Sequence, residues 1–258
     1  MPDLATWKVE MPPWRVEPSP RWIRVRAGET TVADSRRAQL LVWFGPGMLP
    51  TYCLPADDVH TDFFVPASQP AGPPFLVDHD VRVGDLVVPG GARLFRDPPP
   101  PIDGLGGYWT FTWDQGMTWV EEALEIHVHA RDPSKRVDAV PSERHVQVEL
   151  DGRVVADSRR PVAVFETDLP TRWYLPMDDV DQDVLVPSAT ETACPYKGTA
   201  RYWSVRVGDR AHPDLAWSYP DPVVECPRIK GLLAFFNEKV DLIVDGVRQE
   251  RPRSPWSD

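Results

Sequence analysis

The chain has 258 residues, of which 42% are hydrophobic, and its 39 acidic residues outnumber 28 Lys and Arg for a formal net charge of -11. The charge is spread over both halves and no basic face is present, which excludes sequence-independent binding of nucleic acid. Residues 1–10 lack a signal-peptide pattern and no window resembles a membrane span. We therefore expect a cytoplasmic protein with no membrane partner.

Short strands joined by structured loops are predicted throughout, because the 30 prolines are excluded from helix interiors and central strands. In the C-terminal half, apolar and polar residues alternate over 145–150, and Asp151-Gly152 predicts a tight hairpin before a return strand at 153–158. Further strands are predicted at 163–165, 173–175, 184–186, 202–207, 232–236 and 240–244. Single helical turns are predicted at 176–180 and 226–230.

An internal repeat organises the whole chain. The run Val-Ala-Asp-Ser-Arg-Arg at 32–37 recurs at 155–160. Shorter matches follow in the same order, pairing 49–51 with 169–171, 57–59 with 178–180, 65–66 with 186–187, and 81–85 with 205–209. Near its end the first copy carries an insertion, after which Glu122 aligns with Glu238. A repeat of this length indicates two domains, which we place at 1–137, with an N-terminal extension, and at 138–258.

The predicted fold class is all-β, with two antiparallel sheets and one or two short helical turns in each domain. The stretch between the copies, 130–144, is too short for a free linker, so we expect the two copies to pack on each other. The shared run Asp157-Ser158-Arg159-Arg160 is interpreted as structural, with an ion pair or turn bonds at a strand end.

The copies differ in a few places. The second copy has Cys194-Pro195-Tyr196-Lys197-Gly198 where the first has only Gly-Pro-Pro-Phe at 72–75. At four further positions the aligned side chains of the two copies differ in chemical type: Glu166 aligns with Trp43, Trp203 with His79, Trp217 with Arg93, and Tyr219 with Phe95. Residues present in one copy only are candidates for function, so the candidate site belongs to the second copy.

The favoured hypothesis is a pocket for an unidentified small molecule, because ligand sites combine apolar walls with a few convergent polar groups. Its walls would be Trp203, Trp217 and Tyr219, and its polar end Glu166, Tyr196 and Lys197. The same aromatic residues are also typical of a hydrophobic core, which leaves a structural or interaction protein without a ligand as an alternative.

Covalent catalysis is another alternative. Cys194 would be the nucleophile, Lys197 its activator, and Tyr196 or Glu166 the group that transfers a proton. The three cysteines form no Cys-x-x-Cys pair, so no metal and no cofactor are predicted.

The run at 192–203, which contains the Cys-Pro-Tyr-Lys-Gly motif, resembles the signature of a family called domain of unknown function 427, as do 216–222 and 231–245. The resemblance covers both copies, although the first lacks that motif. It implies a β-tent fold, similar to the thalidomide-binding domain of cereblon and to type B methionine sulfoxide reductases, whose zinc-binding cysteine pairs are absent here. In the cereblon-like relatives a tryptophan cage holds a small ligand, which implies an aromatic pocket in the second copy.

A nucleotidyltransferase-like label attached to the same family implies transfer chemistry as a further alternative. Such chemistry needs paired acidic metal ligands and a phosphate cradle, and no matching motif is present. The first copy keeps the scaffold residues and lacks the motif. We therefore predict that it folds alike, with its equivalent cleft filled by Trp43, Phe75 and Phe95.

Overall fold

The computed structural model of the chain describes residues 13–45, 48–69, 72–113, 116–254 and 257. They form two compact units, one that ends at Asp132 and one that begins at Pro133. The first strand of the second unit, β12 (Val137–Pro141), lies inside the stretch that the sequence suggested as the connection between the copies. The packing of the two units on each other stays a prediction.

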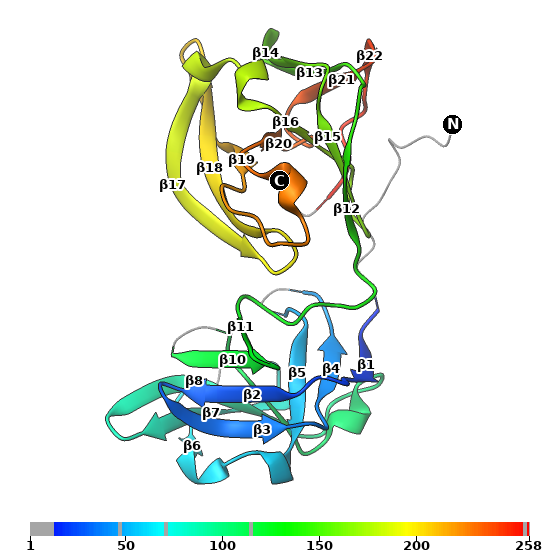
Figure 1. The fold of residues 1–258 in the computed structure, drawn as a ribbon. Coiled ribbons are helices and arrows are strands. Elements are labelled where there is room, and N and C mark those ends of the chain that lie inside the picture. The colour runs from blue at the N-terminus through cyan, green and yellow to red at the C-terminus, as the bar shows by residue number, and fades with distance from the viewer. Residues whose placement is uncertain (1–12, 46–47, 70–71, 114–115, 255–256, 258) are drawn as a thin grey trace. The chain divides into compact units, whose positions relative to one another are not determined.

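The first domain consists of two antiparallel sheets (Figure 1). The strands of its large sheet lie in the order β1 (Arg15–Pro18), β4 (Gln39–Val42), β5 (Thr51–Pro55), β9 (Tyr108–Phe111), β8 (Leu86–Phe95), β7 (Leu76–Val83) and β6 (Phe64–Pro66). The small sheet has the order β11 (Leu124–Ile126), β10 (Met117–Glu121), β2 (Ile23–Ala27) and β3 (Thr30–Ser35).

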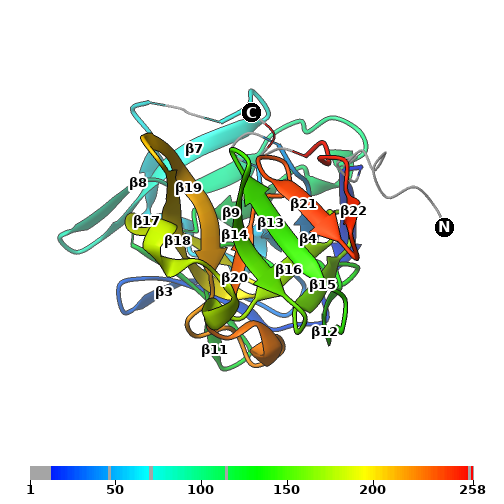
Figure 2. The same cartoon turned by 90° about the horizontal axis from the view of Figure 1, so that it is seen from above.

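The second domain repeats this topology strand for strand. Its large sheet has the order β12, β15 (Val162–Glu166), β16 (Arg172–Leu175), β20 (Leu233–Phe235), β19 (Arg210–Ser218), β18 (Gly198–Val207) and β17 (Leu185–Cys194). Its small sheet, seen face-on in Figure 2, has the order β14 (Arg153–Ser158), β13 (Val146–Leu150), β21 (Asp241–Val244) and β22 (Val247–Arg248). The prediction of an all-β chain with two antiparallel sheets in each domain is confirmed.

Local sequence explains these strands. Buried and half-buried residues alternate along β13, as expected for a strand with one face on a core. Asp151 and Gly152 connect β13 to β14, and both have positive φ, 51° and 78°. This backbone matches the twist of the flanking strands and suits an Asp-Gly pair.

The predicted helical turns are also confirmed as short 3-10 segments, Met177–Asp179 and Pro227–Ile229. A third such segment, Gln182–Val184, precedes β17. The first domain has 3-10 segments at Ala56–Asp58, Thr61–Phe63 and Asp103–Leu105.

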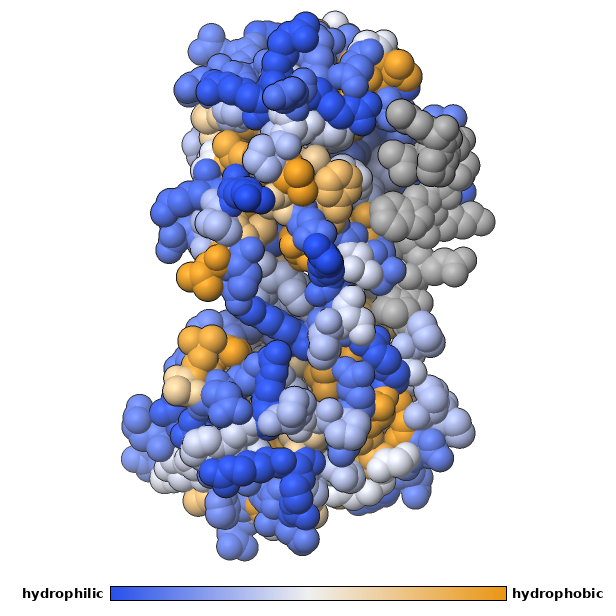
Figure 3. Space-filling view, turned by 45° about the vertical axis from the view of Figure 1, so that its right-hand side comes forward, coloured by the Kyte–Doolittle hydropathy of each residue, from blue (hydrophilic) through white to orange (hydrophobic). Residues whose placement is uncertain are grey.

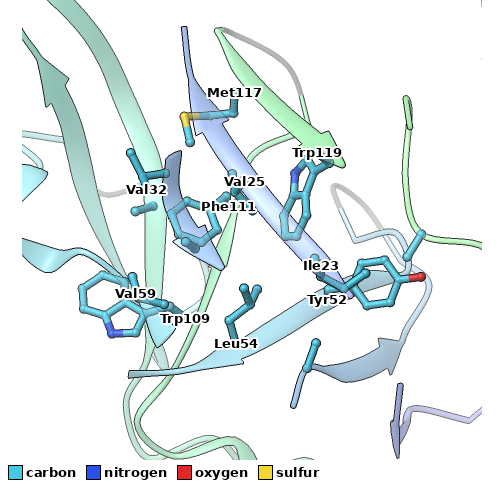
Figure 4. Packing of buried hydrophobic residues seen from close by; sticks show 14 of the residues in the cluster. Ile23, Val25, Val32, Tyr52, Leu54, Val59, Trp109, Phe111, Met117 and Trp119 are labelled. Atoms are coloured by element: carbon cyan, nitrogen blue, oxygen red, sulfur yellow. The ribbon is translucent and has the colours of Figure 1, made fainter. Parts of the chain in front are cut away.

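A hydrophobic core lies between the two sheets of each domain. In the first domain, Ile23 and Val25 of the small sheet face Leu54 and Trp109 of the large sheet (Figure 4). In the second domain, Val146 and Leu242 take part in the equivalent core together with residues of the large sheet. These cores join the two sheets and account for the strand residues that the copies share.

The shared Ser-Arg-Arg run ties a strand end to the first 3-10 turn. The hydroxyl of Ser158 donates to Asp179 Oδ2 at 2.7 Å, and Arg160 donates to the same carboxylate at 3.0 Å. In the first domain, the hydroxyl of Ser35 donates to Asp58 Oδ2 at the same distance of 2.7 Å. Both serines are buried, so the structural interpretation of this run agrees with the contacts.

The register corrects one alignment. Glu122 does not correspond to Glu238. It lies at the hairpin position that Asp245 occupies in the second domain, and both have positive φ. The Glu122 carboxylate accepts from the amide of Trp22 at 2.9 Å, as that of Asp245 does from His145. The expected insertion near the end of the first copy is also corrected, because the register equates Phe111 with Phe235 and Glu121 with Val244, which leaves the first copy only one residue longer there.

The surface is mostly hydrophilic, with apolar side chains in separate patches (Figure 3). The exposed large apolar residues of the second domain include Val140, 45% exposed, and Phe165, 49% exposed. Within the described residues, no helix has the length and apolar character that crossing a membrane requires.

The hydrogen bonds from Ser35 to Asp58 and from Ser158 to Asp179 can be tested as a matched pair. We expect Ser35→Ala and Ser158→Ala each to lower the free energy of unfolding by about 1–2 kcal/mol, because each removes a buried hydroxyl that bonds a carboxylate. The serines belong to different domains, so the double variant should lose the sum of the two effects. Chemical denaturation followed by circular dichroism measures this. No loss in either variant would contradict the structural role.

Candidate functional site

The outer face of the large sheet in the second domain, turned away from the small sheet, carries most of the predicted site. Register places Tyr202 beside Trp217, Trp217 beside Ala234, and Ala234 beside Tyr174. Glu166 follows Val162 and Val164 on β15 with the period of two that keeps residues on one face. We call this set, which includes Cys194 and Tyr219, the outer-face cluster.

Glu166 lies in an ion cluster with two lysines. The ammonium group of Lys197 donates a hydrogen bond to Glu166 Oε2, and Lys135 Nζ lies 3.9 Å from Oε1. The side chains of Glu166 and Lys197 are only 9% and 11% exposed. Burial by itself disfavours the charged lysine, but the Glu166 carboxylate outweighs it and raises the pKa of Lys197 above its ordinary value. Lys197 is therefore held as a cation, paired with Glu166.

A tight turn positions Lys197. Residues 195–197 connect β17 to β18, and the carbonyl of Lys197 accepts from the amide of Val223 at 3.1 Å. The next residue, Gly198, has φ of 106°, and a Cβ there would lie 3.1 Å from the carbonyl oxygen of Asp221. Only glycine fits a position with both constraints, which explains the Lys-Gly pair of the motif.

Beside the ions, aromatic rings fill the face. The indole of Trp217 donates to the hydroxyl of Tyr174 at 3.0 Å, and its ring centroid lies 4.5 Å from that of Phe236. Trp217 and Tyr219 are 6% and 5% exposed. Burial raises the pKa of the Tyr174 and Tyr219 hydroxyls, so both stay protonated. Trp217 and Tyr219, which were predicted to form pocket walls, are therefore packed inside a second core and do not line an open cleft.

Two thiols adjoin this cluster. Cys226 is buried in it, and Cys194, at the end of β17, is half-buried against it. Burial raises the pKa of the Cys226 thiol. The hydrogen bond that the structure shows for the Lys197 ammonium group is to Glu166. Activation of Cys194 by Lys197 stays a prediction.

Two predicted site residues, Trp203 and Tyr196, are not part of the outer-face cluster. Trp203 is one residue from Tyr202 on β18 and so faces the opposite side of the sheet, where it packs against the core between the sheets. The prediction that Trp203 and Trp217 share one pocket is corrected by this alternation. Tyr196 is half-buried in the turn next to Lys197.

Sequence reasoning missed a second ion pair on the same face. Both Nη groups of Arg172 donate to the carboxylate of Glu238, each at 2.7 Å, and the side chain of Glu238 is fully buried. The guanidinium carbon lies 5.7 Å from the ring centroid of Trp217. The sequence alignment paired Glu238 with Glu122, so comparison of the copies did not mark it as a candidate.

The first domain fills the equivalent face differently. By strand register, Trp43 is the counterpart of Glu166 and Phe95 the counterpart of Tyr219. The ring centroids of Trp43 and Phe95 lie 6.2 Å apart. Phe75 stacks on Phe95 at 6.4 Å, so the three residues predicted to fill this cleft do pack together. Polar pairs remain there, because Arg93 donates to the buried Asp78 at 3.0 Å and the hydroxyls of Thr51 and Thr110 lie 2.9 Å apart.

In the described part of the chain, no three His, Cys, Asp or Glu side chains are grouped to hold a metal ion. Fold and site together define a tandem two-domain β protein whose second domain carries the ionic cluster. A family described as a domain of unknown function (DUF427) matches the chain twice, at residues 15–122 and 138–246, and the chain belongs to this family. Among curated proteins no match is found.

The Arg172–Glu238 pair yields a prediction with a pH dependence. Glu238→Gln should lower the free energy of unfolding by about 3 kcal/mol at neutral pH, because it leaves Arg172 buried without its counter-ion. Burial opposes ionisation of Glu238, but the bonds from Arg172 prevail and lower its pKa. The wild-type contribution is thus complete above the unfolded-state pKa and is lost as pH falls through the lower folded-state pKa.

Denaturant titrations at several pH values measure this difference. The gap between wild type and Glu238→Gln should hold steady above about pH 5 and narrow as pH falls below about 4.3, the ordinary pKa of a glutamate. The control is Glu149→Gln, which breaks the exposed pair with Arg248 and should change little. A gap that is constant with pH would contradict the assignment.

Proposed function

We propose that the second domain is a binding module for a small polar molecule, which it holds at the Lys135–Glu166–Lys197 cluster. The observation that carries this proposal is the position of a charged cluster, nearly buried, on a sheet face that the first domain fills with Trp43 and other apolar residues. The two domains therefore share one topology but differ at this position of the face, which is aromatic in the first domain and charged in the second.

Energetics support a role beyond stability. Two charges taken out of water lose more hydration energy than their attraction returns, unless the geometry and the surrounding bonds are excellent. The first domain reaches the same fold with an apolar aromatic group at this position, so the fold does not require the charges. Charges that a fold does not need are typical of sites that bind or react.

Access to the cluster also supports the proposal. Glu166 borders a groove of about 230 Å³ at the end of β15. The groove is lined by residues that include Arg136, Asp138, Phe165 and Thr171. A ligand in this groove could exchange bonds with Glu166 while the aromatic core behind it stays intact. Paired cationic and anionic groups suit a ligand that carries both a donor and an acceptor.

Differential scanning fluorimetry with a library of small polar metabolites tests this function. At a concentration about one hundred times its dissociation constant, a ligand stabilises by about 2.7 kcal/mol, which raises Tm by several degrees. We expect wild type to give such a shift with one chemical class of metabolite. Glu166→Gln and Lys197→Met, each compared with its own ligand-free Tm, should lose it.

The matched control is Asp78→Asn, which breaks the polar pair on the same face of the first domain. This variant should keep the shift of the wild type. A library that yields no shift, or shifts that persist in Glu166→Gln and Lys197→Met, would overturn the proposal.

A further inference from the structure

A second groove opens in the second domain, between the ends of the two sheets. It has a volume of about 230 Å³, and its lining residues belong to or adjoin β12, β15 and β16 on one side and β21 on the other. Its apolar lining consists of Val140, Ala163, Phe165, Trp173, Leu242 and Val244. Val140 and Phe165 are among the most exposed large apolar side chains of this domain. We call it the inner groove.

One cation stands at this groove. Arg144 lines it, and its guanidinium carbon lies 5.8 Å from the ring centroid of Trp173. Its Nε donates to Asp245 at 2.7 Å, and no described residue accepts from its two Nη groups. The Nη edge of an arginine is the edge that binds a carboxylate with two parallel hydrogen bonds.

In the first domain, the arginine equivalent to Arg144 is paired with a carboxylate. Register equates Arg144 with Arg21, because the residues that follow them, His145 and Trp22, make the same hairpin bonds. It likewise equates Val244 with Glu121, since these pair with the first residues of β13 and β2. The carboxylate of Glu121 forms an ion pair with Arg21.

A second donor completes that arrangement. The hydroxyl of Tyr52 donates to Glu121 Oε2 at 3.0 Å, and Tyr52 is the counterpart of Trp173. The first domain thus places a carboxylate of its own against its arginine. The second domain keeps the arginine, replaces the carboxylate with Val244, and has a groove there.

We propose that the inner groove binds a small monocarboxylate with an apolar ring as its body. The carboxylate accepts from the Nη groups of Arg144, in the place that Glu121 fills in the first domain. The ring lies against Phe165 and Trp173. Glu250 at the groove and Asp245 on Arg144 disfavour ligands with more negative charge, such as phosphate esters. Lys135, Glu166 and Lys197 do not line the inner groove, although Phe165 and Thr171 line both grooves.

Calorimetric titration with naphthalene-2-carboxylate tests this site, with naphthalene-2-carboxamide as the neutral probe of the same shape. Wild type should bind the carboxylate about tenfold more tightly or better, because only the anion gains charge-assisted bonds. Arg144→Gln should bind both probes equally. The matched first-domain variant Arg21→Gln, and Glu166→Gln in the other cluster, should keep the wild-type preference.

Val244→Glu is a second variant that keeps Arg144. It supplies the carboxylate from within, as Glu121 does in the first domain, and should abolish binding of naphthalene-2-carboxylate. Circular dichroism confirms that each variant is folded. The proposal is overturned if wild type binds neither probe at roughly 10 mM, a concentration that reveals affinities near the millimolar range. It is also overturned if Arg144→Gln keeps the preference, or if Val244→Glu binds as wild type does.

Discussion

Each large sheet buries both of its faces, and this constraint governs the rest of the structure. One face packs on the small sheet, and the other carries a second core of its own. Because side chains alternate along a strand, residues of the two cores are neighbours in sequence, yet substitution in one core leaves the other intact. The inner core holds the two sheets together in both domains. The outer face could therefore diverge after the duplication without loss of the fold.

Divergence on the outer face separates the two domains chemically. The first domain packs Trp43, Phe75 and Phe95 there, whereas the second has Glu166 with two lysines beside Tyr174 and Trp217. The inner side differs too, because Val244 stands where the first domain has Glu121, while both domains keep the arginine beside it. The second domain thus has an ion pair where the first is aromatic, and an apolar residue where the first has a carboxylate.

Comparison of the copies predicted much of this, because residues aligned along a shared strand keep their face and register. Glu166, Lys197, Trp217 and Tyr219 were singled out in this way, and the structure brings them to one face of the sheet, while their role in a site stays a prediction. Trp203 was assigned to the wrong face, since alignment of the copies does not reveal which of two adjacent aromatic residues points inward. Lys135 precedes the matched repeat, so no comparison could mark it. The pairing of Arg172 with Glu238 joins residues far apart in sequence, and the sequence alignment had placed Glu238 opposite Glu122.

We propose that the Lys135–Glu166–Lys197 cluster serves binding and that the fold does not need it for stability. The most direct measurement is the free energy of unfolding of the double variant Glu166→Met/Lys197→Met, beside the single variant Glu166→Met. The single variant should lose about 3 kcal/mol, because it leaves the buried Lys197 without its counter-ion, while the double variant should stay within about 1 kcal/mol of wild type or exceed it. A double variant as destabilised as the single one would show that the cluster supports the fold, and would contradict the account.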